Sequence, residues 1–203
     1  MRFIYEFGAK GHSIISSTHK TTLMTTVEWA IALQGDSILA VGADPINEAP
    51  MLALAMRQAQ RNGGKIIVID PRPIFLPFDF VHLPVTPDKI SLYFSWLTKG
   101  AMDSEVVADI GQAASKFYQS IPAIEGVEDA LQEQISTLAH QLRKSERPII
   151  VCGTEIVPET TPALAADHAQ LLLKANKRAG LFYLMPGANS FGGSLLAEDG
   201  ISF

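Results

Sequence analysis

Four short loops in this sequence combine glycine or proline with carboxylate, amide or guanidinium side chains, and each directly follows an apolar run. They are Gly42-Ala43-Asp44-Pro45, Asp70-Pro71-Arg72, Gly153-Thr154-Glu155 and Pro186-Gly187-Ala188-Asn189-Ser190. Carboxylates suit ribose hydroxyls, a guanidinium suits a phosphate or a base edge, and backbone amides at helix N-termini suit phosphate. The loops together predict a nucleotide-shaped site with the following candidate cofactor-binding residues: Gly42, Asp44, Pro45, Asp70, Arg72, Gly153, Thr154, Gly187 and Asn189.

Each loop also has a purely structural interpretation. Asp44 and Asn47 are explained equally well as turn and helix N-cap residues. Asp70 is explained equally well as the end of a strand, and the Asn189-Ser190 pair is better explained as the cap of a following helix. The prediction of a site therefore depends on the repetition of such loops at strand ends.

No motif in the sequence identifies a catalytic residue or a metal site. There is no HExxH, nucleophile elbow, P-loop or correctly spaced GxGxxG. The histidines show no metal-ligand spacing, and His140 and His168 fall in helical patterns where we expect solvated side chains. The single cysteine, Cys152, excludes an internal disulfide and an iron–sulfur cluster held by this chain. It lies in an apolar run, which predicts a buried thiol.

The elements that must position the loops are clearest in residues 37–73. Apolar runs at Ile38 to Val41 and at Lys65 to Ile69 predict two short buried strands. Between them, Leu52, Met56 and Ala59 fall on one face of a predicted helix that ends at the Gly63-Gly64 pair. Strand, helix and strand in this order predict a βαβ unit with parallel strands.

The rest of the chain continues the alternation of helices and strands. The patterns predict helices at about 21–33, 86–99, 106–118, 131–142 and 162–177, and strands at 147–153 and 181–185. Prolines in 73–84 allow only a short edge strand there. The predicted fold class is α/β, a doubly wound, mainly parallel sheet with helices on both faces, Rossmann-like. We expect a single domain over residues 1–203; the alternative is two lobes, at about 1–125 and 126–203.

Composition narrows the class of partner. The 203 residues carry a formal net charge of −5, which argues against nucleic acid as the main partner. No apolar run reaches the roughly 20 residues of a membrane-spanning helix, so direct membrane insertion is not expected. The N-terminus lacks a signal-peptide pattern, and a cytoplasmic protein is predicted.

The segment GADPINEAPMLALAMRQAQRNGGKIIVIDPRP resembles the G-x-(N/D)-P, helix, DPR segment of molybdopterin oxidoreductases such as formate dehydrogenase α subunits. ERPIIVCGTEI and LFYLMPGANSFGG resemble a following strand and the PGANSxG-type loop of that family. That loop is also seen in the related large iron–sulfur subunit, the G subunit, of NADH–quinone oxidoreductase (NADH dehydrogenase). The resemblance covers roughly residues 13–203. It implies the central α/β domain of a longer polypeptide, of the formate dehydrogenase/DMSO reductase middle-domain type.

The resemblance also implies a cofactor. In that family, loops at these strand ends hold molybdopterin guanine dinucleotide. By resemblance, Gly42, Asp44 and Pro45 would lie along a phosphate or pterin edge, and Asp70 and Arg72 would face the guanosine end.

Two departures from the family argue against catalysis by this chain alone. Family members carry an N-terminal iron–sulfur domain built on cysteines, which is missing here. They ligate the metal through Cys, selenocysteine or Ser, whereas the nearest match here places Thr18, a poor ligand, at that position. The implied function is a fragment or split subunit of such an oxidoreductase. It would be a cofactor-binding remnant or a scaffold beside partner subunits that carry iron–sulfur clusters.

Two other interpretations remain open. RPIIVCG resembles the start of the central domain of thiamin-diphosphate enzymes, which would make the chain a stand-alone nucleotide-binding or regulatory domain. The aromatic-rich segment 75–80 would alternatively pack on another subunit and give the chain a purely structural role.

Overall fold

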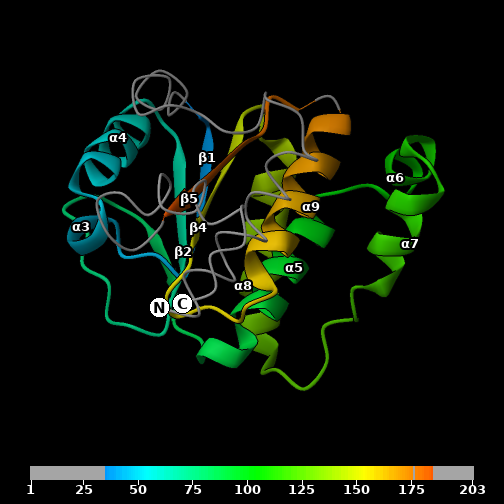
Figure 1. The fold of residues 1–203 in the computed structure, drawn as a ribbon, viewed down its shortest axis with the longest axis horizontal. Coiled ribbons are helices and arrows are strands. Elements are labelled where there is room, and N and C mark those ends of the chain that lie inside the picture. The colour runs from blue at the N-terminus through cyan, green and yellow to red at the C-terminus, as the bar shows by residue number, and fades with distance from the viewer. Residues whose placement is uncertain (1–34, 176, 185–203) are drawn as a thin grey trace, which may run out of the picture.

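The computed structural model of the chain describes residues 35–175 and 177–184, and all structural statements below refer to them. The predicted helix at 21–33 lies outside the described residues. The described part contains a five-stranded sheet in which every neighbouring pair is parallel (Figure 1). Its strands are β1 (Ser37–Val41), β2 (Lys65–Ile69), β3 (Val81–Leu83), β4 (Pro148–Gly153) and β5 (Gly180–Leu184).

The strand order β3-β2-β1-β4-β5 makes the sheet doubly wound. The chain moves outward from β1 to β3 and then crosses back to place β4 on the other side of β1. This confirms the predicted fold class, and β3 is the short edge strand that the prolines predicted. In an open sheet of this kind, ligands bind where the winding direction reverses, outside the carboxyl ends of the strands. Here that point lies between β1 and β4.

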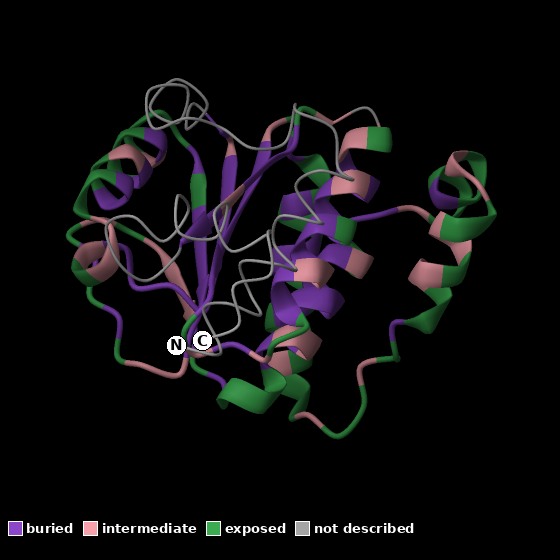
Figure 2. Ribbon diagram, viewed as in Figure 1, coloured by how far each residue is buried: buried purple, intermediate pink, exposed green. Residues whose placement is uncertain are grey.

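Alternate residues of the strands face opposite layers of helices, because side chains along a strand point to opposite faces. On one face, Ile38 and Ala40 of β1 pack with Leu52 and Met56 of α4 (Pro50–Arg61), which follows the short α3 (Pro45–Glu48). Figure 2 shows the strands and the inner sides of the helices buried.

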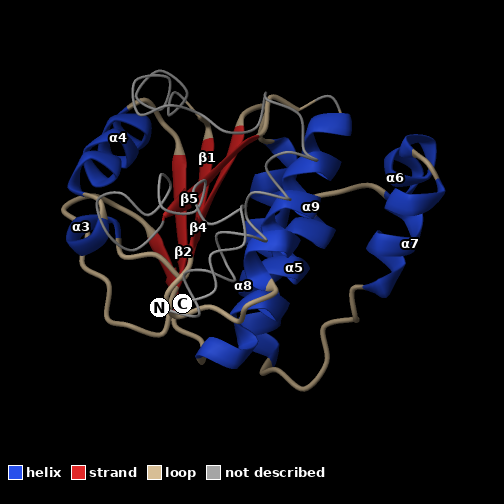
Figure 3. Cartoon of the chain, viewed as in Figure 1, coloured by secondary structure: helices blue, strands red, loops and turns tan. Residues whose placement is uncertain are grey.

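The opposite face of the sheet carries the larger core. Leu39 and Val41 pack there with residues of α5 (Ile90–Gly100), α8 (Asp129–Lys144) and α9 (Thr161–Lys174). A 3-10 turn, η1 (Pro87–Lys89), leads into α5. Two short helices, α6 (Ser104–Ile110) and α7 (Gln112–Ser120), lie beyond α9 (Figure 3). No helix of the described residues is long and apolar enough to span a bilayer.

Two predicted helices are each interrupted. The one expected over 106–118 is split into α6 and α7 at Gly111, whose φ is +129°. The one expected after Ala43 is split at Ala49, because a residue that precedes proline is pushed out of the helical region. Strands still alternate with helical connections as predicted, because each break only divides one connection between two strands into two helices.

His168 is buried between helices, so the prediction of a solvated side chain was wrong for it and right for the exposed His140. The imidazole meets the rings of Phe94 and Phe117 edge-on, at 4.8 and 5.1 Å between centroids. Its Nε2 lies 3.2 Å from Thr98 Oγ1 and 3.4 Å from Ser95 Oγ. Both hydroxyls already donate to backbone carbonyls one turn back, so Nε2 carries the proton and donates to them.

Burial also changes how His168 and Cys152 titrate. Burial lowers the pKa of His168 from 6.5 to about 3, because the apolar surroundings disfavour the imidazolium. The Cys152 thiol is fully buried as predicted, and burial raises its pKa above the ordinary value. The described core therefore holds both groups neutral at pH 7.

We expect His168 to make stability depend on pH. The folded protein keeps the ring neutral, so its contribution is fully present above pH 6.5 and is lost as pH falls from 6.5 towards 3. A His168→Leu variant should lose a pH slope of up to about 1.4 kcal/mol per pH unit in this range. Urea unfolding at several pH values measures the slope. The exposed matched control, His140→Leu, should keep the wild-type slope, and an equal loss in both variants would contradict the assignment.

Candidate functional site

The parallel register brings the carboxyl ends of neighbouring strands to one edge of the sheet. Val41 at the end of β1 is level with Ile69 of β2 and with Cys152 of β4. The structure therefore places the predicted residues of three loops at a common edge, namely Gly42, Asp44, Pro45, Asp70, Arg72, Gly153 and Thr154. Gly187 and Asn189 lie outside the described residues.

Asp70 and Arg72, the pair expected at a guanosine, bind each other. The Asp70 carboxylate is fully buried. Its Oδ1 accepts from the backbone N–H of Arg72 at 2.8 Å and from Nε at 2.9 Å, and its Oδ2 accepts from Nη2 at 2.8 Å. This bidentate geometry is the strongest that a carboxylate and a guanidinium form.

Glu48 completes the ion pair, and the sequence did not identify it. Its Oε1 accepts from Arg72 Nη1 at 2.5 Å, so the guanidinium lies between two carboxylates. Hydrogen bonding to Asp70 raises the pKa of Arg72 above its already high ordinary value, burial opposes this, and Glu48 adds to the rise. The charge of Arg72 is therefore balanced within the protein.

Asp44 is a helix cap, as its structural interpretation predicted. Its Oδ1 accepts from the backbone N–H of Asn47 at 3.3 Å, and its Oδ2 accepts from the Asn47 side-chain amide at 2.7 Å. Glu48 Oε2 accepts from the Asp44 backbone N–H at 3.1 Å, which makes the arrangement similar to a capping box. Glu48 thus connects the loop after β1 to the loop after β2. An acidic residue in the first turn of a capped helix was the signal that could have identified it.

The two glycines at the reversal point are packed against protein atoms. Gly42 has φ +59°, and a Cβ added there would lie 2.1 Å from Val157 Cγ1. A Cβ added to Gly153 would lie 1.8 Å from the carbonyl oxygen of Gly42. Thr154 is buried and its Oγ1 donates to the Leu184 carbonyl at 3.0 Å. Glycine is required here because β1 and β4 approach closely, and Val157 fills the space above Gly42.

As these residues lie, they do not fit a guanine dinucleotide. The polar groups of Asp70, Arg72 and Thr154 are engaged within the chain, and the space beside Gly42 is filled. The described residues also contain no group of three or more His, Cys, Asp or Glu placed to hold a metal ion. The arrangement is suited to locking the loops after β1, β2 and β4 to one another.

Removing Arg72 should destabilise the fold far more than weakening Glu48. Arg72→Ala leaves the buried Asp70 carboxylate unpaired, which we expect to lower the free energy of unfolding by about 3 kcal/mol. Glu48→Gln keeps the bidentate pair and should cost about 1 kcal/mol. Chemical denaturation of both variants at pH 7 measures the difference. Equal losses would show that the Asp70–Arg72 pair is not the dominant contact.

Gly153→Ala should disrupt the edge of the sheet. The added methyl group would overlap the Gly42 carbonyl, and backbone on both sides leaves no room for relaxation. We expect a loss of at least about 3 kcal/mol or failure to fold. The matched control, Gly63→Ala, places its methyl where no atom lies within 4 Å and should cost about 1 kcal/mol through its positive φ alone. Thermal melting compares the two, and a mild effect at Gly153 would contradict the close approach of β1 and β4.

Comparison with known proteins finds distant relatives of one kind. The chain is 26% identical over 179 residues to the G subunit of NADH-quinone oxidoreductase from Pseudomonas putida, a match that covers 82% of this chain and 20% of that protein. The corresponding G subunit from Escherichia coli strain K12 is 24% identical over 176 residues, covering 77% of this chain and 18% of that protein. The chain thus spans about a fifth of the length of the curated relatives it matches. These similarities show a distant relationship to a subunit of NADH-quinone oxidoreductase.

Two further matches say less about function. A family model described as "Domain of unknown function (DUF371)" matches residues 7–70. A solved structure of the formyltransferase/hydrolase complex from Methylorubrum extorquens in complex with methylofuran is similar over 96% of this chain and 47% of that chain. Its TM-score is 0.52 at 16% sequence identity, which supports the fold alone.

Proposed function

We propose that the chain is a scaffold domain of a subunit in a redox complex, related to the G subunit of NADH-quinone oxidoreductase and not catalytic alone. The observation that carries this proposal is the similarity to that G subunit, which extends over about four fifths of the chain. The parallel, doubly wound sheet agrees with the central α/β domain that the loop motifs predicted. A scaffold of this kind would pack against partner subunits that carry iron–sulfur clusters.

The ion-pair network favours a scaffold over a cofactor-binding domain. A cofactor phosphate or guanine at Arg72 would have to compete with Asp70 and Glu48, which hold its guanidinium from two sides. The same contacts stabilise the loops of the carboxyl edge without any ligand. The structural contacts of Asp70 and Arg72, which the resemblance assigned to the cofactor, therefore support the scaffold.

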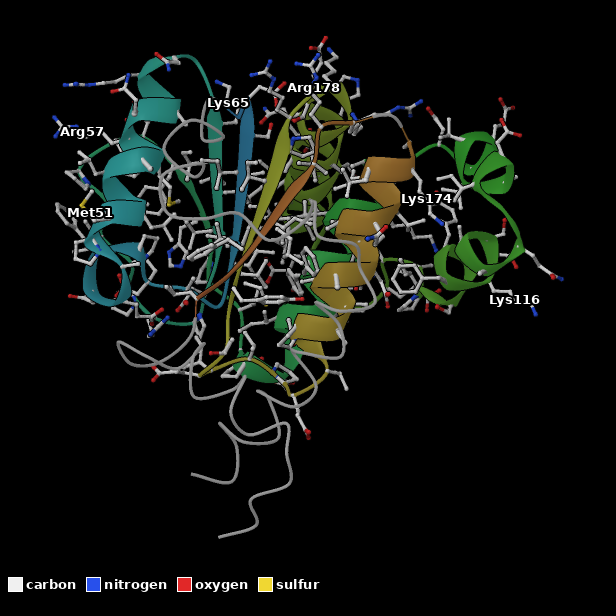
Figure 4. All side chains as sticks on the ribbon, turned by 45° about the horizontal axis from the view of Figure 1, so that its top comes forward. Met51, Arg57, Lys65, Lys116, Lys174 and Arg178 are labelled. Carbon is white, nitrogen blue, oxygen red and sulfur yellow. The ribbon has the colours of Figure 1, made fainter. Side chains whose placement is uncertain are left out.

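Exposed apolar side chains give such a scaffold a surface for contact. Phe75, in the aromatic-rich segment after β2, is 79% exposed, and Met51 of α4 is 67% exposed. Figure 4 shows Met51 on α4, away from the sheet. Contiguous exposed apolar surface marks sites of protein contact, and Phe75 is the most exposed large apolar side chain of the described residues. Phe75 is therefore the residue through which we expect a partner subunit to be recognised.

A second candidate function is retention of the guanine dinucleotide. It is favoured by the reversal of winding between β1 and β4, where doubly wound sheets bind ligands. Binding would require Val157 to move away from Gly42, and Gly187 and Asn189 would then complete the site by resemblance.

Two measurements separate these functions. Affinity purification of the tagged protein from its native cells should recover a Cys-rich partner with stoichiometric iron, and Phe75→Ser should reduce this recovery. Calorimetric titration with GDP, together with assays for molybdenum, tungsten and pterin fluorescence, should detect no cofactor. GDP-specific binding with a Kd below about 100 µM would instead support the cofactor-binding remnant.

Two other results would contradict the proposed scaffold role. Recovery of the protein without iron would contradict a place beside iron–sulfur subunits. Selective thermal stabilisation by FAD, NAD or acyl-CoA would favour a stand-alone nucleotide-binding or regulatory domain.

A further inference from the structure

The edge of the sheet opposite the candidate site carries a concentration of cations. Helices that connect parallel strands end where the next strand begins, so helix C-termini and strand N-termini share the amino edge. Eight basic residues of the described chain lie there. Arg143 pairs with Asp103, and the Lys177 amine donates to the Arg143 and Ser145 carbonyls. The other six are Arg61, Lys65, Lys144, Arg147, Lys174 and Arg178. Figure 4 shows Lys65 and Arg178 on this upper edge, with Lys174 on the flanking α9. The chain as a whole is acidic, with a net charge of −5, so its cations are unevenly distributed.

Three of these cations form a row across the strand starts. Lys65 is level with Ser37 of β1, which is level with Pro148 of β4. The backbone N–H of Arg178 donates to the Glu146 carbonyl at 2.8 Å, which places Arg178 beside the residue that precedes Arg147. Since neighbouring strands lie about 4.8 Å apart, the backbone of the row spans about 14 Å from β2 to β5.

The described carboxylates near the row do not form ion pairs with its side chains. Asp36 accepts hydrogen bonds from the Ser145 hydroxyl and from the backbone N–H groups of Glu146 and Arg147, the latter two at 2.6 and 3.0 Å. Burial raises the pKa of Asp36, but these hydrogen bonds outweigh it and the pKa is lowered overall. The Asp36 carboxylate therefore connects the residues before β1 to the residues before β4. Among the described residues, none of the six basic side chains forms an ion pair with a carboxylate.

The helix dipole explains only half of the cluster. Basic residues are favoured in the last turn of a helix, which accounts for Arg61, Lys144 and Lys174. Lys65, Arg147 and Arg178 stand at or just before strands, where no dipole favours a positive charge. Like charges gathered at one edge repel one another, and an opposing acidic surface would relieve this repulsion.

We propose that the amino edge of the sheet docks an acidic surface of a partner protein in the complex. This inference rests on the proposed role as a complex subunit and names a second contact surface for a partner protein, separate from Phe75. A folded partner can place carboxylates opposite Lys65 and Arg178 while leaving the exposed Glu146 unopposed. A continuous polyanion such as a nucleic acid would be repelled by Glu146 and by the net negative charge of the chain.

Removing two of the three positive charges in the row tests whether the amino edge docks a partner protein. The test variant is Lys65→Gln/Arg178→Gln, and the matched control, Lys89→Gln/Lys116→Gln, removes two exposed cations elsewhere. In the affinity purification described above, the test variant should recover about fivefold less of the iron-containing partner at moderate salt, and the control should match the wild type. Added salt should weaken wild-type recovery, because exposed charges are screened.

Each outcome distinguishes the docking surface from the proposed function. If the test variant recovers the iron-containing partner as well as the wild type does, the docking surface is wrong and the proposed function stands. If the wild type recovers no iron-containing partner, the proposed function fails. In that case, fluorescence anisotropy with a labelled peptide of alternating Glu and Ser decides whether the amino edge binds acidic protein segments. The inference would be overturned if the test and control variants lost peptide binding equally. It would also be overturned if the test variant lost more affinity for duplex DNA than for the acidic peptide.

Discussion

The close approach of β1 and β4 is the constraint on which the rest of the structure depends. Gly153 at the end of β4 faces the carbonyl oxygen of Gly42 just after β1, at a distance that allows no side chain. This contact joins the two halves of the winding, because β1 leads outward to β3 while β4 leads outward to β5. The same contact also determines which atoms lie at the carboxyl edge between β1 and β4. At the place where doubly wound sheets bind ligands, Val157 lies against Gly42 and the Gly42 carbonyl lies against Gly153.

Electrostatics gives the two edges of the sheet different roles. At the carboxyl edge, the Asp70, Glu48 and Arg72 charges are paired within the chain, and they hold successive loops together. At the amino edge, Asp36 is engaged by hydrogen bonds while the basic side chains extend outward. A parallel sheet separates these edges by the full length of its strands. One edge can therefore stabilise the domain while the other is available to a partner.

The contacts at the carboxyl edge agree with the proposed scaffold role. The GADP and DPR segments stabilise the fold in this chain, because Asp44 caps α3 and Asp70 pairs with Arg72. These contacts account for the polar side chains of both segments without a ligand.

The sequence by itself determined the main strands, their alternation with helices and the burial of Cys152, and it offered the cap at Asp44 as one of two interpretations. These depend on local periodicity and on contacts within four residues, which a single segment contains. The tertiary structure alone decided that Arg72 is held by Glu48, that Val157 covers Gly42 and that His168 is buried against Phe94 and Phe117. Those contacts join segments distant in the chain, or depend on which side of a helix meets a neighbour. The sequence therefore identified the loops at one edge of the sheet, and only the tertiary structure showed that Glu48 after β1 holds the Arg72 guanidinium after β2.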